Sequence, residues 1–263
     1  MSTGQTALVT GACSGIGLAL ARELAGRGYG LVLVSNREAP LAAAASDLAA
    51  THGVAVHTVV MDLARPDAAS LLLERVQALG VDVDVLVNNA GFFFFGEVAD
   101  ADPTRAAAMV TLHALTPSLL CTAFAKRFRE KRGGHILLVS SISAWKDFPG
   151  IAYYAATKRF LRHFARSLRS ELAPYGVNVT VLAPGATATG LYDQTGAPVE
   201  LGRRLGVMMD AGVVARAGVR AMLARRAVCI PGVLTRVMVV LAVLTPQAVI
   251  DLIRRRAPWL RPQ

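Results

Sequence analysis

The feature that most constrains the fold is a regular alternation of short apolar segments, rich in valine and leucine, with longer segments rich in alanine, leucine and arginine. Strands of a parallel sheet have this continuous apolar character because helices cover both faces of the sheet. The alternation therefore predicts an α/β fold with one doubly wound parallel sheet and helices on both faces. We expect about seven strands, at residues 6–10, 30–35, 54–60, 83–88, 135–140, 177–184 and 227–232.

The charge and cysteine content narrow the class of protein. The net charge is +10, but the arginines are scattered over many expected helices, so we expect no nucleic-acid partner and only a field that attracts anionic ligands. Cys13, Cys121 and Cys229 are too widely spaced for a disulfide framework or a metal site, and they suit a reducing compartment. The N-terminal residues lack the pattern of a signal peptide. We therefore expect a cytoplasmic protein without a metal.

The C-terminal region, 232–263, follows the last expected strand as a helical extension. Its apolar segment 237–244 is too short to cross a bilayer, and we interpret it as a buried helix. Peripheral membrane contact by this region is a less favoured alternative. Covering the cleft and contacting a second subunit also fit the pattern, and the sequence does not choose among these roles.

A glycine-rich segment, TGACSGIG, lies between the first expected strand and the helix that follows it. Glycines in this position allow a tight turn and a close approach of the backbone to a pyrophosphate, which then faces the helix N-terminus. We therefore predict a single NAD(P)-binding, Rossmann-like domain over residues 1–263, since no repeat or linker divides the chain. The predicted contacts in this segment are Gly11, Cys13, Ser14, Gly15, Ile16 and Gly17.

The residues after the second expected strand bear on cofactor choice. An acidic residue there would bind the ribose hydroxyls of NAD, but this chain has Ser35, Asn36 and Arg37. Hydroxyl, amide and guanidinium groups suit a 2′-phosphate, so we expect NADP(H) to be favoured over NAD(H); the alternative is that Arg37 is only a solvated residue at a helix start. Asp62, followed by Leu63, can accept a hydrogen bond from the adenine amino group or cap a helix.

The segment YYAATK contains two tyrosines and a lysine. In a helix Tyr154 and Lys158, four residues apart, share one face, whereas Tyr153 diverges from it. An ammonium group beside a phenol, whose pKa is ordinarily about 10, lowers that value and lets the phenol exchange a proton with an alcohol or carbonyl oxygen. A second donor for the substrate oxygen can come from Ser140, Ser141 or Ser143, directly after the fifth expected strand.

These motifs, in this order, resemble the classical short-chain dehydrogenase/reductase family. TGACSGIG is similar to its cofactor loop, NNAG (88–91) to its fourth-strand motif, YAATK to its Tyr-x-x-x-Lys pair and APG (183–185) to its sixth-strand turn, so the likeness covers nearly the whole chain. It implies that Ser141 is the catalytic serine, that Lys158 binds the nicotinamide ribose and that 186–204 is a substrate lid. It also implies a homodimer or homotetramer. The further cofactor contacts it implies are Asn89, Ala90, Gly91, Tyr154, Lys158, Pro184, Gly185 and Thr187, with Asn88 bracing the cleft.

One departure from the family concerns its usual asparagine in the helix after NNAG, which helps hold a water linked to the lysine. His113 stands at the nearest matching position in this chain. An imidazole can donate and accept protons at neutral pH, so one interpretation of His113 is a catalytic residue that relays protons. The alternative is a histidine packed near the cleft without a role in the reaction.

The substrate side contains candidate apolar walls. The segment GFFFFGE follows the fourth expected strand, and its rings can line a pocket or pack into the core. We therefore predict an NADP(H)-dependent carbonyl reductase or alcohol dehydrogenase for a hydrophobic ketone or secondary alcohol. The alternatives are an epimerase or dehydratase of the same fold, and a non-catalytic dinucleotide-binding protein. The candidate pocket residues are Phe93, Phe94, Trp145, Leu191 and Tyr192.

Overall fold

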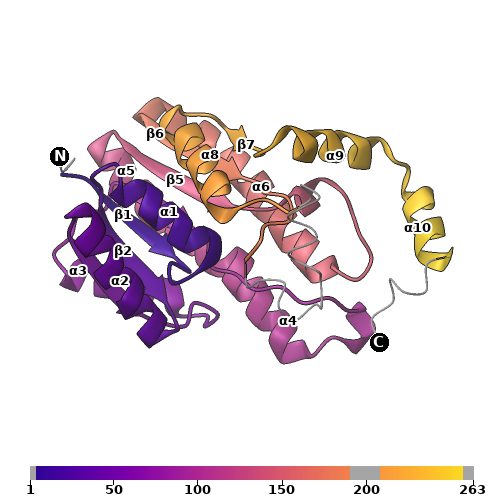
Figure 1. Ribbon diagram of the computed structural model, residues 1–263, viewed down its shortest axis with the longest axis horizontal. Helices are drawn as coiled ribbons and strands as arrows, with labels where there is room; N and C mark the ends of the chain where they lie inside the picture. Colours follow the sequence, from indigo (N-terminus) through magenta and orange to yellow (C-terminus); the bar gives the residue numbers. More distant parts are fainter. Residues whose placement is uncertain (1–3, 190–207, 257–263) are drawn as a thin grey trace.

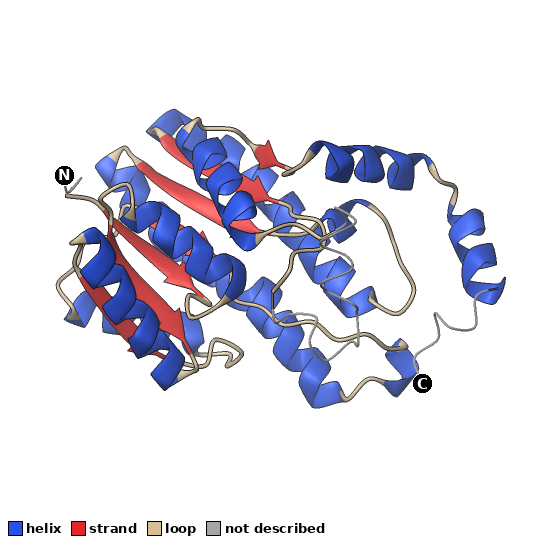
Figure 2. Ribbon diagram, viewed as in Figure 1, coloured by secondary structure: helices blue, strands red, loops and turns tan. Residues whose placement is uncertain are grey.

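The computed structural model describes residues 4–189 and 208–256. Its centre is a seven-stranded sheet in the order β3-β2-β1-β4-β5-β6-β7, with every pairing parallel, so the predicted doubly wound sheet is confirmed (Figures 1 and 2). The strands are β1 (Thr6–Thr10), β2 (Gly30–Ser35), β3 (Val56–Val60), β4 (Val85–Asn88), β5 (Gly134–Val139), β6 (Val177–Leu182) and β7 (Val228–Cys229).

Helices cover both faces of this sheet. One buried apolar cluster joins the sheet to α3 (Ala68–Ala78), α5 (Thr116–Lys131) and α6 (Ala152–Leu172). A second cluster, on the opposite face, joins it to α1 (Gly15–Ala25), α2 (Glu38–His52) and α8 (Ala211–Leu223). The remaining helical segments are η1 (Val98–Asp100), α4 (Pro103–Val110), η2 (Thr111–Leu115), η3 (Ile142–Trp145), η4 (Ala173–Tyr175), α9 (Val233–Leu244) and α10 (Gln247–Arg256).

The last strand is shorter than the sequence suggests. The apolar segment 227–232 forms only the two-residue edge strand β7. Pro231 follows closely and has no N–H for a sheet hydrogen bond, and Gly232 adopts a φ of 81° that turns the chain away. The chain therefore leaves the sheet at this point and continues into α9.

The helical stretch Pro103–Lys131 is long and apolar enough, by length and composition, to cross a membrane. In the fold it packs under the sheet, where Leu120, Cys121, Phe124 and Phe128 are fully buried. This packing accounts for part of the apolar composition, because a helix in the core of an α/β domain needs such a face. Val110, Leu115 and Leu119 of the same stretch are exposed.

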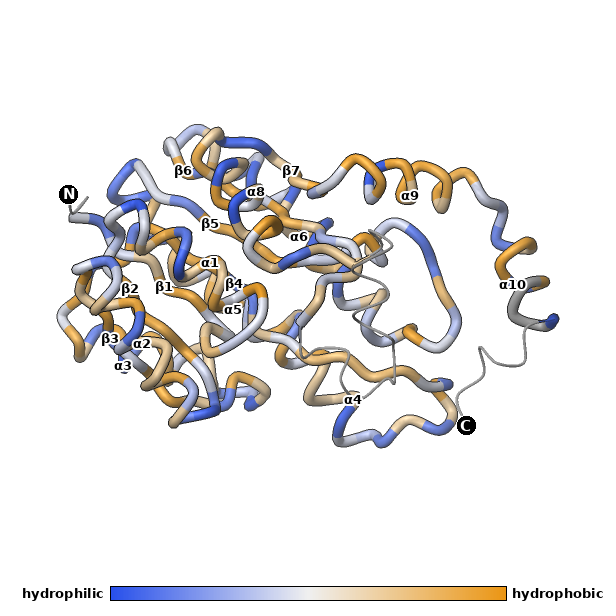
Figure 3. The backbone as a smooth tube through the Cα atoms, viewed as in Figure 1, coloured by the Kyte–Doolittle hydropathy of each residue, from blue (hydrophilic) through white to orange (hydrophobic). Residues whose placement is uncertain are grey.

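The prediction of a buried helix at 237–244 is wrong. In α9 only Thr235 and Val239 are buried, while Leu241 is 59% exposed and Leu244 is 72% exposed. Figure 3 shows α9 as a largely hydrophobic helix that runs out past the sheet, and Figure 1 shows α10 beyond it. The helix is short and lies past the sheet edge, so no second layer covers its apolar side chains in the part of the chain that the structure describes.

Candidate active site

The candidate site is a cleft of about 680 Å³ at the carboxyl ends of the strands. Parallel strands bring the loops that follow them to one edge of a sheet, and ligands of such folds bind there. The structure brings most of the predicted residues together in the lining, which contains Gly11, Cys13, Ser14, Gly15, Ile16, Gly17, Ser35, Asn36, Arg37, Asp62, Leu63, Asn89, Ala90, Gly91, Phe93, His113, Ser141, Tyr154, Lys158, Pro184, Gly185 and Thr187.

The glycine loop is held against the loop after β4. The Asn89 amide donates hydrogen bonds to the carbonyl oxygens of Thr10 (2.9 Å) and Gly11 (3.3 Å). The Thr10 hydroxyl in turn accepts from the backbone N–H groups of Asn89 and Ala90. Gly17 lies so close to this junction that a Cβ there would be 2.1 Å from the Gly11 carbonyl oxygen. The glycine loop therefore packs closely against the loop after β4, and the cleft lies in front of the N-terminus of α1.

At the end of β2, one polar residue is buried and the next two are exposed. Ser35 is buried, and its hydroxyl donates to the Cys13 Sγ at 3.0 Å and accepts from the Arg37 N–H at 3.2 Å. Asn36 and Arg37 are exposed at the cleft, and the first acidic residue is Glu38, inside α2. Ser35 therefore braces the turn, and Asn36 and Arg37 are exposed residues of the cleft lining.

Cys13 is electrostatically coupled to this turn. Burial raises the pKa of the Cys13 thiol, but hydrogen bonds with Ser35 and Arg37 and the charge of Arg37 lower it, and the net pKa is below its ordinary value. A lowered thiol pKa is a sign of a positive local potential. The charge of Arg37 thus acts on this end of the cleft.

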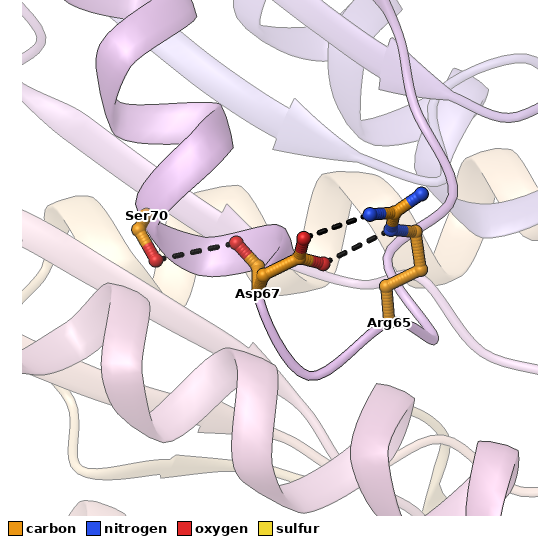
Figure 4. Close-up of polar contacts among 3 residues, drawn as sticks. All are labelled: Arg65, Asp67 and Ser70. Atoms are coloured by element: carbon orange, nitrogen blue, oxygen red, sulfur yellow. Dashed lines mark hydrogen bonds and ion pairs between the residues drawn. The ribbon is translucent and has the colours of Figure 1, made fainter.

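Asp62 does not cap a helix. Its Oδ1 accepts from the Ala64 N–H at 2.9 Å, in the turn directly after β3. Helix α3 begins later, next to Asp67, whose carboxylate pairs with the Arg65 guanidinium through two bonds of 2.9 and 2.7 Å (Figure 4). The helix-cap interpretation of Asp62 is therefore not observed, and its carboxylate lies in the lining of the cleft.

The tyrosine and lysine of YAATK lie in the first turns of α6, as their spacing predicts. The Lys158 Nζ is 5.6 Å from the centroid of the Tyr154 ring and donates to the Val139 carbonyl oxygen at 3.0 Å. Lys158 is buried, and burial lowers its pKa to about 8. The lysine therefore still carries its proton at neutral pH, as a poorly solvated cation beside the phenol.

The three serines after β5 have different environments. Ser140 is buried, and its hydroxyl donates to the Lys158 carbonyl oxygen at 2.8 Å. Ser143 is also buried and lies outside the cleft lining. Ser141 is half-buried in the lining, and its hydroxyl oxygen accepts from the Ser143 N–H at 3.2 Å. Ser141 is thus the serine whose hydroxyl hydrogen can be offered to a ligand.

The two adjacent tyrosines point to different neighbours. Tyr154 lies in the cleft with the edge of the Phe93 ring at 5.0 Å and His113 at 5.8 Å between ring centroids. Tyr153 packs near Phe94, at 6.3 Å, and neither residue is in the cleft lining. The divergence expected from helical spacing is therefore present in the structure.

His113 occupies η2, a π-helical turn between α4 and α5, and is buried. Its Nε2 accepts from the Phe92 N–H at 3.1 Å, so the ring proton is on Nδ1, which faces the Thr157 Oγ1 at 3.2 Å. The Thr157 hydroxyl then donates to the Tyr154 carbonyl oxygen at 2.9 Å. Burial, and then the charge of Lys158, hold the pKa of His113 well below 6.5. A neutral His113 therefore ties the loop after β4 to the turn that carries Tyr154.

This neutral histidine predicts an acid-sensitive fold. The unfolded chain binds a proton on the imidazole near pH 6.5, whereas the folded protein binds it only at lower pH. The contribution of His113 to the free energy of unfolding is therefore fully present above about pH 6.5. It decreases as the pH falls from there toward the pKa of His113 in the folded protein. We expect His113→Asn to weaken this pH dependence, as measured by urea unfolding from about pH 8 to 5. His135, whose pKa burial also lowers, contributes equally to both proteins. Identical pH profiles of the two proteins would contradict a lowered pKa of His113 in the fold.

The substrate side differs in part from the expectation. Phe93 lines the cleft, but Phe94 and Trp145 do not; Phe94 lies under the Arg105 guanidinium at 5.1 Å, and Trp145 lies under Arg162 at 4.3 Å. Leu191 and Tyr192 lie outside the described residues, as does the expected lid 186–204 beyond residue 189. Lining residues that the sequence did not single out are Met61, Phe92, Arg105, Leu112, Val139 and Thr189. Of these residues, Phe92 could have been predicted as a lining residue, because it belongs to the aromatic segment GFFFFGE.

Comparison with known proteins gives a consistent result. A family model described as short chain dehydrogenase matches residues 5–199. The chain is 34% identical over 200 residues to the inactive hydroxysteroid dehydrogenase-like protein 1 of Homo sapiens, covering 72% of this chain and 57% of that protein. It is 34% identical over 191 residues to an uncharacterized oxidoreductase of Bacillus subtilis, covering 72% and 78% respectively. A solved short-chain dehydrogenase from Sphingobium yanoikuyae in complex with NADPH superposes with a TM-score of 0.78 at 29% identity, covering 97% of this chain and 94% of that one.

Proposed function

Because the chain belongs to the short-chain dehydrogenase family, we propose that it is an NADP(H)-dependent oxidoreductase that interconverts a hydrophobic ketone and its secondary alcohol. The observation that carries this proposal is the buried Lys158 beside Tyr154, with Ser141, in the same cleft as the glycine loop. That arrangement supplies a proton donor, a cation that lowers its pKa and a second hydrogen-bond donor.

The residues present fit a dinucleotide. The glycine loop is so compact that a Cβ at Gly17 would collide with backbone atoms, which leaves the N-terminus of α1 accessible to a pyrophosphate. Asp62 and Leu63 would contact the adenine side, while Asn89, Ala90, Gly91, Pro184, Gly185 and Thr187 would line the nicotinamide side. When bound, the cofactor supplies or accepts the hydride.

In the direction of reduction, Ser141 and Tyr154 act on the carbonyl oxygen of the substrate. Ser141 donates a hydrogen bond to it, and Tyr154 gives it the proton that the product alcohol needs. The ammonium of Lys158 stabilises the phenolate that remains on Tyr154, so the proton leaves at a lower pKa than in a free phenol. Phe92 and Phe93 would exclude water from the reacting groups.

The choice of NADP(H) over NAD(H) rests on Asn36 and Arg37, and the NADPH complex of the Sphingobium protein supports it. We expect Arg37→Gln to weaken NADPH binding about tenfold, because a charge-assisted hydrogen bond to the 2′-phosphate is lost, and to leave NADH binding nearly unchanged. Tryptophan quenching with each nucleotide measures both affinities. Arg27→Gln, which removes an exposed arginine paired with Glu23, serves as the control; an equal loss for both nucleotides in Arg37→Gln would refute the 2′-phosphate contact.

The cellular setting is part of the same proposal. Cys13, Cys121 and Cys229 are free thiols, which supports a cytoplasmic protein. The family supports a homodimer or homotetramer, which light scattering can measure directly.

A second candidate is a dinucleotide-binding protein without turnover. The human relative is named as an inactive hydroxysteroid dehydrogenase-like protein, and His113 stands where the family usually has asparagine. Such a protein would bind NADPH and fail to oxidise it with every carbonyl compound offered. The intact Ser141, Tyr154 and Lys158 favour the enzyme.

A further inference from the structure

Helix α9 buries a polar side chain and exposes most of its apolar side chains. Its buried residues are Thr235 and Val239, so one of its few polar side chains faces inward. Its exposed large apolar side chains are Val233, Leu234, Val237, Met238, Val240, Leu241, Val243 and Leu244, with exposed fractions from 42% to 75%. A helix on a water-facing surface has the opposite pattern. Apolar area of this extent marks a surface that another phase or molecule covers.

This surface is fixed in orientation by specific contacts. The Thr235 side chain packs against Gly185 on the inner side of α9. At the other end, the Lys146 Nζ donates to the Thr245 carbonyl oxygen at 2.7 Å. The Arg236 guanidinium donates to the Ile230 carbonyl oxygen at 2.9 Å. The apolar face is therefore held outward by polar contacts at both ends of the helix, and it is not the unfixed tail of the chain.

The sequence of this region is rich in arginine. From 233 to 256 it contains Arg236, Arg254, Arg255 and Arg256 and a single acidic residue, Asp251, and the structure describes Arg236 and Arg256 as exposed. In α10, Val249 (41%) and Leu252 (46%) are also exposed. An apolar face next to a basic cluster complements an anionic lipid surface, where side chains enter the acyl region and arginines meet the phosphates.

A second copy of the chain is the competing occupant of this face. Pairing two such faces would bring together segments that each contain four arginines and one acidic residue between 233 and 256. Repulsion of this kind opposes pairing through this face and favours an anionic partner there, and it leaves the other surfaces of the chain open to self-association. The observed charges therefore distinguish between the two occupants.

We propose that α9 and the start of α10, residues 233–252, form a docking surface for an anionic lipid bilayer. The twelve residues of α9 extend about 18 Å, less than a bilayer core, so the helix lies in the plane of the interface and does not span it. This role is independent of the proposed reaction, because none of the residues of α9 lines the cleft.

Vesicle co-flotation of the full chain tests the proposal, with vesicles of phosphatidylcholine alone and of phosphatidylcholine mixed with phosphatidylglycerol. We expect binding to the anionic vesicles, weaker binding at high salt, and about tenfold or greater loss in Leu241→Glu/Leu244→Glu. Val60→Glu/Val98→Glu is the matched control, since those side chains are 50% and 54% exposed at other sites. Thermal shifts with NADPH report whether each variant is folded.

The contrary results are equally specific. Wild-type protein that does not float with anionic vesicles overturns the proposal, as does equal binding by the Leu241→Glu/Leu244→Glu variant. Light scattering of both proteins identifies the competing occupant: a wild-type oligomer that dissociates in this variant, without lipid binding, assigns the face to a second copy of the chain.

Discussion

Replacing Tyr154 with phenylalanine will lower turnover about a thousandfold and leave NADPH affinity within a fewfold of the wild-type value. The change removes the only hydroxyl of the residue that would protonate the carbonyl oxygen, and general acid catalysis typically contributes this much to the rate. The ring itself stays, so its contacts with Phe93 and His113 remain. Steady-state oxidation of NADPH with an accepted ketone, together with tryptophan quenching by NADPH, measures the two quantities separately.

The adjacent residue gives the matched control. Tyr153 has the same side chain but packs near Phe94, outside the cleft lining. Tyr153→Phe should therefore keep most of the activity. Equal losses in the two variants would contradict the assignment of the acid to one face of α6.

Replacing Gly17 with alanine will weaken NADPH binding about a hundredfold. The added Cβ would lie 2.1 Å from the Gly11 carbonyl oxygen and 2.4 Å from the Asn89 Nδ2, so the backbone of the glycine loop must move. Overpacking at a rigid backbone contact costs about 1–3 kcal/mol, and the displacement falls directly on the predicted pyrophosphate site. Quenching titrations measure the affinity, and thermal unfolding without nucleotide reports the cost to the fold.

Gly133 provides the control for this change. A Cβ at Gly133 meets nothing within 4 Å. The residue directly precedes β5, at the N-terminal end of the strands, whereas the cleft lies at their carboxyl ends. Gly133→Ala should leave NADPH affinity and thermal stability close to wild type. Unchanged affinity in Gly17→Ala would show that the pyrophosphate does not rest on this loop.

Much of the site could be predicted because it depends on local spacing. Tyr154 and Lys158 share a face through the i, i+4 geometry of any helix, and Gly11, Gly15 and Gly17 follow directly from a strand. The loops that carry these residues meet because parallel strands align their carboxyl ends. The parallel sheet of about seven strands follows from the alternation of apolar segments, whereas the order of those strands is seen only in the structure.

The remaining features depend on contacts distant in the sequence. The state of His113 is decided by the Phe92 N–H and the Thr157 hydroxyl, 21 and 44 residues away, and no local pattern shows which of its nitrogens is protonated. The Ser35 hydroxyl donates to the Cys13 Sγ, a partner 22 residues away that no local pattern indicates. The exposure of α9 was missed for a similar reason, since an apolar segment looks the same whether or not another element covers it.

The most direct measurement of the proposed function is NADPH oxidation by the purified chain, followed by absorbance with a panel of hydrophobic ketones, aldehydes and 3-oxoacyl thioesters, with NADH in parallel. The proposal predicts turnover of at least one hydrophobic carbonyl compound with NADPH, and slower turnover of the same compound with NADH. Tight binding of NADPH without oxidation across the whole panel would contradict it and identify the chain as a dinucleotide-binding protein without catalysis.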